Sequence, residues 1–560
     1  MKRIHKMIAL LTAATLVAGC YEDKGNYDYQ NIGEVIITFD KEEEKAASNL
    51  YVGDLLEIHP IITFADDAGS SEHLTYQWVM VDLNTGEMEK PADWHTRDLK
   101  WTASKLIESS YLWLIVTDTQ RNIEYRNKLS CSVLSPFAED GVLVLGEKDG
   151  KSQFSFIKAT DFEYSDFEEY QGIYAQENGE TLPDGPLFIH EHFCNDYSTN
   201  GQLFLFTRNG AVDIDGMDFK RDITAEEIFD GGSYPVDVEY MSDAMFMSKI
   251  DLIADQDGHV YSRMKATANL FHSGYFLNDK LSLDGESLAG CRFIMAPFNS
   301  FCACLVHDTA KKRLFLITDS GAGNGQWDDP GLANAGQPMA LTYTATQLEE
   351  LPEGFVRVDD LSSVNVLCIG YNRDYSGSSE RAYTIIFERG GELFCQEFAI
   401  ERTHYYASFA LKNPKIQKIQ GLPASNPSCI YVQPYRTNNS FIYFAFGNKL
   451  WIYDAQSNLS YPWVKPYRAN IVDMDAENYR SRKLALALDD GSVIIQNAVT
   501  CHYEKNQTYL YDSKRELLPP PPGEDEEPGK WIDRDPIALG TIKDICFKRN
   551  TGNGWDVNTR

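Results

Sequence analysis

Seven segments between Phe137 and the C-terminus share one pattern, in which an apolar run, a glycine-containing turn and a second apolar run follow one another. They span 141–157, 200–215, 251–264, 311–321, 382–398, 440–454 and 483–496. Asn-Gly, Asp-Gly and Gly-Gly turns between apolar runs are the strongest short-range signal of a β-hairpin. One hairpin per ~60 residues suits four-stranded blades with long loops. The pattern therefore predicts a β-propeller over 137–560, with seven blades as the simplest count and six or eight also compatible.

One further apolar run, 539–549, lies close to the end of the chain. We predict that it closes the propeller by pairing with the blade that begins at Gly141. The proline-rich and acidic segment 517–529 lies just before it and reads as a surface loop.

The region 33–136 has a different spacing, with short β-rich runs separated by polar turns. The runs are 34–39, 50–64, 74–82, 111–118 and 126–134. This spacing predicts a small antiparallel β-sandwich, so the fold class of the whole chain is all-β. Trp78 and Trp113 fall in the middle of runs and are expected in the core. Trp94 and Trp101 fall in a less regular segment where exposed rings are possible.

The first 29 residues carry the pattern of an exported, lipid-modified protein. Lys2, Arg3 and Lys6 precede an apolar run over Met7–Val17 that is too short to cross a bilayer at about 20 residues per helix. Small residues then lead to Cys20, the expected site of diacylglycerol attachment. We predict a signal peptide over 1–19 and a lipidated tether over 20–32; the alternative is an ordinary signal peptide followed by a chance cysteine.

Charge and cysteine usage limit the partners. Loss of Lys2, Arg3 and Lys6 with the signal takes the net charge from −32 to −35, which opposes binding to nucleic acid or anionic lipid headgroups. Membrane contact is therefore expected through the lipid anchor only. Of the eleven cysteines, ten besides Cys20 are scattered and none form a CxxC motif, which is typical of small buried side chains.

No complete metal site is predicted. His190 and His192 form a His-x-His pair and remain weak candidate ligands, because no third ligand is identifiable. Two further segments, beginning at Asp213 and at Asp255, resemble fragments of calcium loops. Each lacks the first ligand position of an EF-hand, so we interpret both as hairpin turns.

The sequence lacks a serine nucleophile elbow, a Cys/His pairing and a spaced pair of catalytic carboxylates that stands out from the general acidity, so we expect neither an enzyme nor a cofactor. Aromatic residues in turn-like segments are the candidate ligand-binding groups, because they offer stacking surfaces for sugars and contacts for peptides. The candidates are Trp327, Tyr461, Trp463 and Trp531.

The segment 20–39, CYEDKGNYDYQNIGEVIITF, followed by 141–157, GVLVLGEKDGKSQFSFI, resembles the PKD-like family of lipoproteins of Bacteroidota. The resemblance implies a PKD-like sandwich followed by a propeller-like region. It also implies a gene beside a SusC-type TonB-dependent transporter and its SusD-type lid. The sandwich departs from ordinary PKD domains, because the usual Gly-Asp-Gly turn after the tryptophan is absent.

Together these features predict an outer-membrane lipoprotein that faces the cell exterior. It would be a non-catalytic, ligand-binding accessory of a SusCD-type nutrient uptake system, with the SusC-type transporter and SusD-type lipoprotein as partners and a glycan or oligopeptide as ligand. Two alternatives stay open. One is an enzyme on a propeller scaffold, such as a glycan lyase or hydrolase, with its site near Trp327 or His190. The other is a purely structural subunit of the importer.

Overall fold

The protein is mostly β and divides into two compact units, Met1–Ser135 and Pro136–Arg560, which we describe separately. No described helix is long and apolar enough to cross a bilayer. The computed structural model describes residues 33–65, 69–83, 86–160, 164, 166–193, 201–247, 249–267, 270–294, 303–318, 336–374, 380–403, 408–432, 441–463, 465–477, 483–498, 509–516 and 535–548.

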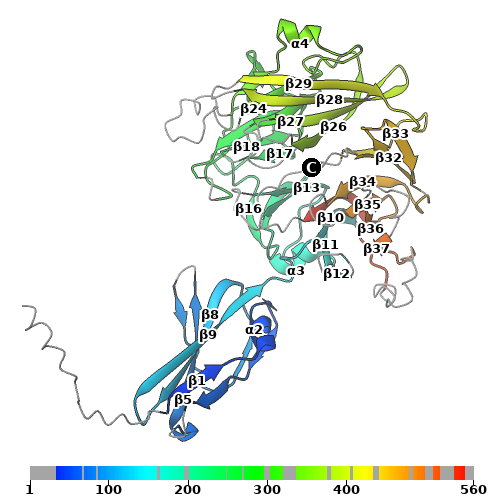
Figure 1. The fold of residues 1–560 in the computed structure, drawn as a ribbon. Helices are drawn as coiled ribbons and strands as arrows, with labels where there is room; N and C mark the ends of the chain where they lie inside the picture. The colour runs from blue at the N-terminus through cyan, green and yellow to red at the C-terminus, as the bar shows by residue number, and fades with distance from the viewer. Residues whose placement is uncertain are drawn as a thin grey trace, which may run out of the picture. The chain divides into compact units, whose positions relative to one another are not determined.

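The first unit is built from one large sheet and two small ones (Figure 1). The large sheet has the order β2 (Leu50–Tyr51), β9 (Ile123–Leu134), β8 (Ile107–Asp118), β5 (Leu74–Asp82), β6 (Met88–Glu89). The small sheets pair β1 (Val35–Thr38) with β4 (Ile61–Phe64), and β3 (Leu55–Ile58) with β7 (Leu99–Thr102). One helix that the hydrophobic pattern did not predict, α2 (Lys41–Ala47), begins after Asp40, whose carboxylate accepts a hydrogen bond from Glu42 N. A single 3₁₀ turn, η1 (Ser71–His73), precedes β5.

The burial of the tryptophans in this unit agrees only partly with the sequence expectation. Trp78 is fully buried, as expected. Trp94 lies in the segment where the sequence allows exposed rings, but its ring is buried, with the half-buried Trp101 packed edge-on against it. Trp113 points out of the core, because its neighbours Leu112 and Leu114 take the inward positions of β8. The expectation for Trp113 was therefore wrong.

The second unit contains seven main antiparallel sheets among its described residues, in chain order from cyan to red in Figure 1. The first sheet is β12 (Phe167–Tyr170), β11 (Lys151–Ala159), β10 (Gly141–Lys148), β38 (Thr541–Lys548); the second is β13 (Pro186–His192), β14 (Gln202–Thr207), β15 (Gly210–Asp215), β16 (Arg221–Thr224); the third is β17 (Met241–Phe246), β18 (Ile250–Asp255), β19 (Val260–Met264); the fourth is β22 (Cys291–Ile294), β23 (Ala303–Asp308), β24 (Arg313–Thr318), β25 (Pro338–Ala340).

The remaining three sheets are four-stranded, whereas the third sheet has three strands. The fifth is β26 (Asn365–Asp374), β27 (Glu380–Arg389), β28 (Glu392–Thr403), β29 (Ser408–Lys418); the sixth is β30 (Cys429–Val432), β31 (Phe441–Phe446), β32 (Lys449–Asp454), β33 (Leu459–Pro462); the seventh is β34 (Ile471–Ala476), β35 (Lys483–Leu488), β36 (Val493–Asn497), β37 (Tyr509–Asp512). Between them lie a small hairpin, β20 (Ser282–Leu283) and β21 (Glu286–Ser287), and two short helices, α3 (Ile173–Asn178) and α4 (Ala345–Glu349).

One edge strand of each sheet contacts the corresponding strand of the next sheet. These strands, which we call the ring strands, are β38, β13, β17, β22, β26, β30 and β34, and the succession closes because β34 contacts β38. β38 pairs antiparallel with β10, from Gly141 opposite Lys548 to Glu147 opposite Thr541, so the predicted closure by the C-terminal run is confirmed. The chain enters β38 at Gly540, where φ is +76° and an added Cβ would lie 2.3 Å from Glu147 O, so only glycine fits there.

Carboxylates on the ring strands bind backbone N–H groups of the adjacent ring strand. Asp544 Oδ2 accepts from Ile189 N at 2.6 Å. An edge strand leaves N–H groups without a ladder partner, and a buried one without any partner is costly. Bonds of the same kind among the described residues run from Phe293 N to Asp243, from Ile545 N to Asp473 and from Phe547 N to Asp475. These acids therefore satisfy donors that the sheets themselves leave open.

The cost of burying one of these acids predicts a pH effect. Burial raises the pKa of Asp243 to about 7, against the opposing hydrogen bond from Phe293 N and the charge of Arg292. A raised pKa means that the folded chain holds this proton longer, so stability falls as pH rises from about 4 to about 7. We expect the Asp243→Asn variant to lose this part of the pH dependence, which amounts to on the order of 4 kcal/mol between these two pH values. Urea unfolding at a series of pH values measures it; parallel pH profiles for the two proteins would contradict the assignment.

Candidate functional site

Of the four residues predicted to bind ligand, the structure describes Tyr461 and Trp463. Cys20, Trp327 and Trp531 lie outside the described residues. Tyr461 is half-buried on β33. Trp463 is 5% exposed and packs in the core of the sixth and seventh sheets, so its ring offers no surface for a ligand. This burial runs against the role predicted for Trp463.

The His-x-His pair takes part in a different arrangement from the one predicted. His190 and His192 are both 1% exposed on β13, and their ring centroids lie 6.2 Å apart. His192 stacks on Phe246 of the third sheet, with the centroids 4.1 Å apart. Its Nε2 faces Asp213 on β15 rather than His190.

Three side chains from separate segments meet where the second and third sheets pack together; we call them the His–Asp–His cluster. His192 Nε2 lies 2.7 Å from Asp213 Oδ2. His272 Nε2 lies 2.7 Å from the same oxygen. Asp213 is fully buried on β15, while the His272 side chain is 12% exposed. The cluster therefore concentrates two imidazoles on one carboxylate oxygen inside the fold.

The segment that carries His272 is fixed by backbone hydrogen bonds on both sides. Ala266 N donates to Ser273 O at 2.7 Å, beside β19. Phe276 N donates to Ile228 O at 2.8 Å. The buried ring of Phe276 then anchors the segment under the guanidinium of Arg263, 4.9 Å from the ring centroid.

Two polar side chains of the second sheet border the cluster. Gln202 pairs with His192 across β13 and β14, and its Nε2 donates to Asp222 Oδ2 at 2.9 Å. Asp222 is the extra residue of a β-bulge in β16, opposite the Asp213/Ile214 step of β15. Its carboxylate lies 3.9 Å from His272 Nε2, and its side chain is 49% exposed. Asp222 therefore connects the cluster to solvent.

A buried ion network continues from the cluster into the third sheet. Arg263 NH1 lies 3.3 Å from His272 Nδ1, and Arg263 Nε donates to Asp251 Oδ2 at 2.7 Å. Lys265 Nζ lies 3.2 Å from Asp251 Oδ1. The side chains of these three charged residues are at most 1% exposed. Asp251 is thus shared by two buried cations.

Burial and charge set the protonation of the cluster. Burial lowers the pKa of His192, although Asp213 opposes this shift. Burial alone would raise the pKa of Asp213, but its contacts with His192 and His272 outweigh that effect and hold the pKa below its ordinary value. Asp213 is therefore a carboxylate at neutral pH.

A second acidic cluster lies at the turn after β18, and its central carboxylate, Asp255, accepts hydrogen bonds from the turn itself. Asp255 Oδ1 accepts from Asp257 N and from His259 N, each at 2.9 Å. Its Oδ2 lies 2.9 Å from His259 Nδ1 and 3.1 Å from Tyr261 Oη. Both oxygens of Asp255 serve the hairpin turn, which agrees with the turn interpretation of this segment.

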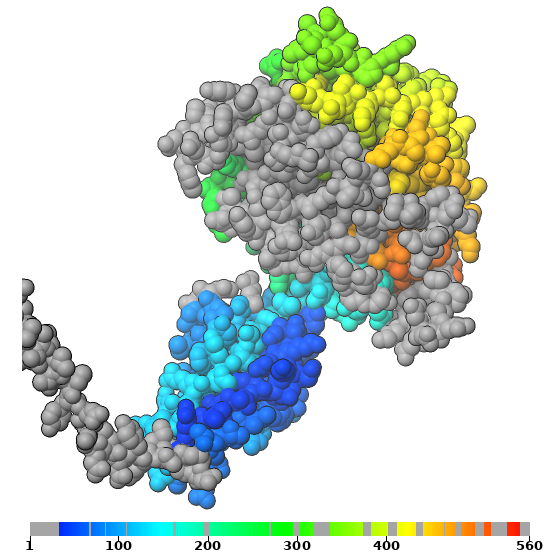
Figure 2. All heavy atoms as spheres, viewed as in Figure 1, coloured from blue at the N-terminus to red at the C-terminus, as the bar shows by residue number. Residues whose placement is uncertain are grey.

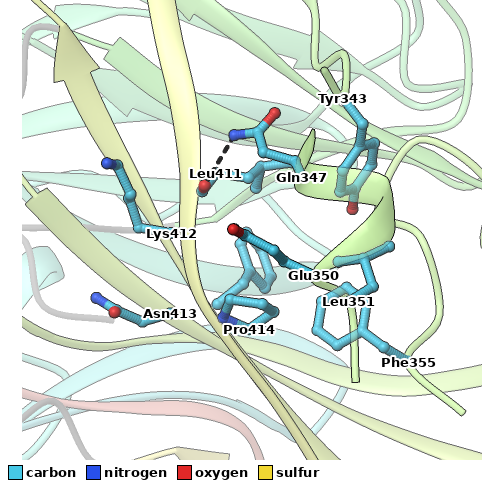
Figure 3. Close-up of a pocket in the computed structure, with 10 residues that line it drawn as sticks. Tyr343, Gln347, Glu350, Leu351, Phe355, Leu411, Lys412, Asn413 and Pro414 are labelled. Carbon is cyan, nitrogen blue, oxygen red and sulfur yellow. Dashed lines mark hydrogen bonds between the residues drawn. The ribbon is translucent and has the colours of Figure 1, made fainter. Parts of the chain in front are cut away.

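A surface pocket of about 350 Å³ lies between α4 and β29 (Figure 3). Gln347 holds it in shape: its Oε1 accepts from Thr344 N at 2.8 Å as a helix cap, and its Nε2 donates to Leu411 O on β29 at 2.9 Å. In Figure 2, α4 (green) stands at the surface beside the yellow strands. The pocket combines aromatic and apolar walls with a few polar groups, the usual composition of a small-ligand site. Its lining residues are Tyr343, Gln347, Glu350, Leu351, Phe355, Phe398, Leu411, Lys412, Asn413 and Pro414.

The sequence model of the PKD-like family matches residues 20–186. The N-terminal region is therefore PKD-like. No curated protein matches the chain.

Solved structures similar to the chain include WD40 and propeller-like proteins. A quinonprotein alcohol dehydrogenase-like protein from Bacteroides thetaiotaomicron is 12% identical, with a TM-score of 0.38 over 92% of this chain and 99% of its own. The WD40 domain of Neurospora crassa Pan2 is 12% identical, with a TM-score of 0.31 over 56% of this chain and 75% of its own. Citrobacter koseri AztD is 11% identical, with a TM-score of 0.32 over 85% of this chain and 98% of its own.

Proposed function

We propose that this chain is an outer-membrane lipoprotein, anchored through an acylated Cys20 and facing the cell exterior, that serves a SusCD-type nutrient importer as a non-catalytic, ligand-binding accessory. The observation that carries the proposal is at residue 20, where the small residues of the signal end and the match to the PKD-like family begins. A mature chain that starts at an acylated cysteine needs no other membrane element, since two or more acyl chains give a stable anchor.

As part of this proposal, the second unit is a seven-bladed β-propeller. The closed succession of ring strands, and the completion of the first sheet by β38, support this count. The pocket beneath α4 supports ligand binding, because Tyr343 and Phe355 bring rings to a concavity of about 350 Å³ that is open to solvent. A glycan or an oligopeptide fits this composition.

Replacement of Cys20 by alanine tests the anchor. We expect the Cys20→Ala protein to leave the membrane fraction almost completely, because no acyl chain remains to hold it. Cys429→Ala, which alters a partly buried thiol on β30, is the matched control and should stay with the membranes. Cell fractionation with immunodetection measures both. Unchanged membrane retention of Cys20→Ala would refute the anchor.

Two further experiments address surface exposure and role. Protease treatment of intact cells should degrade the protein, and complete protection would exclude the outer face. Purification of the native protein from membranes should retain the SusC-type transporter and the SusD-type lipoprotein. Binding of oligosaccharides or oligopeptides to the purified chain then distinguishes an accessory binder from a structural subunit, while turnover of a polymer would favour an enzyme instead.

A further inference from the structure

Two buried oxygens beside the His–Asp–His cluster have no hydrogen-bond donor among the described residues. They are Asp213 Oδ1, on a fully buried side chain, and Gln202 Oε1, on a residue that is 8% exposed. A buried acceptor without a donor carries its full desolvation cost, so such oxygens indicate a missing partner. Turning the Gln202 amide over does not help, because its Nε2 already donates to Asp222. A cation would satisfy acceptors of this kind.

The cluster also brings metal-ligating atoms together. His192 Nε2, His272 Nε2 and a carboxylate oxygen of Asp213 all lie within 4.8 Å of one another. If both imidazoles only donated hydrogen bonds, Asp213 Oδ2 would accept two N–H groups while Asp213 Oδ1 accepted none from the described residues. An ion between the three groups instead uses both ring nitrogens as acceptors and lets Asp213 bind through either oxygen.

We propose that His192, Asp213 and His272 bind a divalent transition-metal ion of the zinc type. Two imidazoles and one carboxylate form a ligand set that suits Zn²⁺ and similar ions, whereas Ca²⁺ and Mg²⁺ require mainly oxygen ligands. The negative charge of Asp213 and Asp222 favours a cation at this position. The neighbouring cations Arg263 and Lys265 form their ion pairs with Asp251 rather than with these two carboxylates.

The ion reaches the site from the side of Asp222. The Asp222 side chain is 49% exposed and that of His272 12%, whereas His192 and Asp213 are closed off from solvent. Asp222 lies 3.9 Å from His272 Nε2 and is placed to supply the fourth ligand directly or through a water molecule. Three inner ligands with one position toward solvent allow the ion to exchange.

Metal binding changes one contact of the buried ion network. A metal on Nε2 requires that the proton of neutral His272 sits on Nδ1, which faces Arg263 NH1 at 3.3 Å. That contact must lengthen, while Arg263 keeps its shorter bonds to Asp251 at 2.7 Å and to Phe271 O at 2.9 Å. The loop segment around His272 therefore adjusts on binding.

Metal analysis of the purified mature chain tests the proposal directly. After treatment with a chelator and dialysis against Zn²⁺, we expect one ion per chain and a raised melting temperature. Co²⁺ in place of Zn²⁺ should give the visible absorption bands of a low-symmetry nitrogen and oxygen site. Folded chain that takes up no ion overturns the proposal, and a response to Ca²⁺ but not to Zn²⁺ overturns the assigned class.

Variants locate the ion. His272→Ala alters the most exposed of the three ligands and should weaken Zn²⁺ binding by more than about a hundredfold, since loss of an outer partner alone costs about 10–100-fold. Asp222→Asn should weaken binding less. His259→Ala, in the cluster whose Asp255 oxygens serve the turn, is the matched control and should bind as the wild type does. Binding that survives His272→Ala but is lost in His259→Ala would place the ion elsewhere and refute the site.

Discussion

Deletion of Thr541–Arg560 is expected to abolish the cooperative folding of the second unit. β38 completes the first sheet by pairing with β10, and it contacts the ring strands on both sides, β13 and β34. Its side chains Ile545, Cys546 and Phe547 are at most 1% exposed. Burial of Ile545 and Phe547 alone contributes about 3–6 kcal/mol, a large share of the roughly 5–15 kcal/mol that stabilises a typical domain.

Loss of β38 also removes hydrogen bonds between neighbouring ring strands. Asp544 would no longer accept from Ile189 N, and Asp473 and Asp475 would lose Ile545 N and Phe547 N as donors. The edge of β10 would be open for pairing with other chains. Circular dichroism melts and limited proteolysis should therefore show early, non-cooperative unfolding and aggregation.

A shorter truncation separates this effect from the mere loss of the C-terminus. Removal of 549–560 leaves β38 in place, so this variant should melt close to the full chain. The first unit has its own core around Trp78 and should keep its transition in both truncations. If the long truncation melts as a single cooperative unit at the wild-type temperature, the closure by β38 is not what stabilises the second unit.

The hairpins of the second unit could be predicted because their signals are local. The Asp149-Gly150 turn joins β10 to β11, and Gly390-Gly391 joins β27 to β28, both as expected. In the segment 311–321 the prediction was only partly right: β24 forms there, but among the described residues it pairs with the preceding β23 and with β25. A glycine-containing turn predicts which two strands pair. The turn between β23 and β24 has no glycine, so the sequence did not predict that these two strands form a hairpin.

Which side of a strand faces the core was harder to predict than the position of the strand in the sequence. Alternation in β8 allows Trp113 to lie on either face, since both faces carry large apolar residues. The structure places it outward, where Lys128 Nζ lies 5.2 Å from its ring centroid and 3.3 Å from that of Tyr111. A cation over two rings stabilises this outward position, and only the pairing of β8 with β9 brings Lys128 there.

The His–Asp–His cluster shows why a site of this kind escapes local motifs. The His-x-His spacing singles out His192, but its partner Asp213 lies 21 residues further along the chain, in a segment that the sequence predicts to be a hairpin turn. His272 lies another 59 residues away, in a segment without any motif. Packing of the second sheet against the third joins them, and no spacing in the sequence records which strands will face each other.

Replacement of Asp251 by asparagine should be the most destabilising single change in the buried ion network. The carboxylate faces Arg263 Nε at 2.7 Å and Lys265 Nζ at 3.2 Å, and also accepts from Met247 N at 3.2 Å. Asparagine has nearly the same shape but no charge, so two buried cations would lose their carboxylate. Removal of one partner from a buried ion pair typically costs about 3–5 kcal/mol, because the remaining charge stays desolvated.

Asp184→Asn is the matched control, because it makes the same chemical change in an exposed pair. Asp184 Oδ2 lies 2.7 Å from Lys151 Nζ, but the two side chains are 36% and 65% exposed. Water already solvates this pair, so its loss should cost no more than about 1 kcal/mol. Urea unfolding in the presence of a chelator keeps metal binding out of the comparison. Equal effects of Asp251→Asn and Asp184→Asn would mean that Arg263 and Lys265 find other partners, and that burial of the network contributes little to the stability of the third sheet.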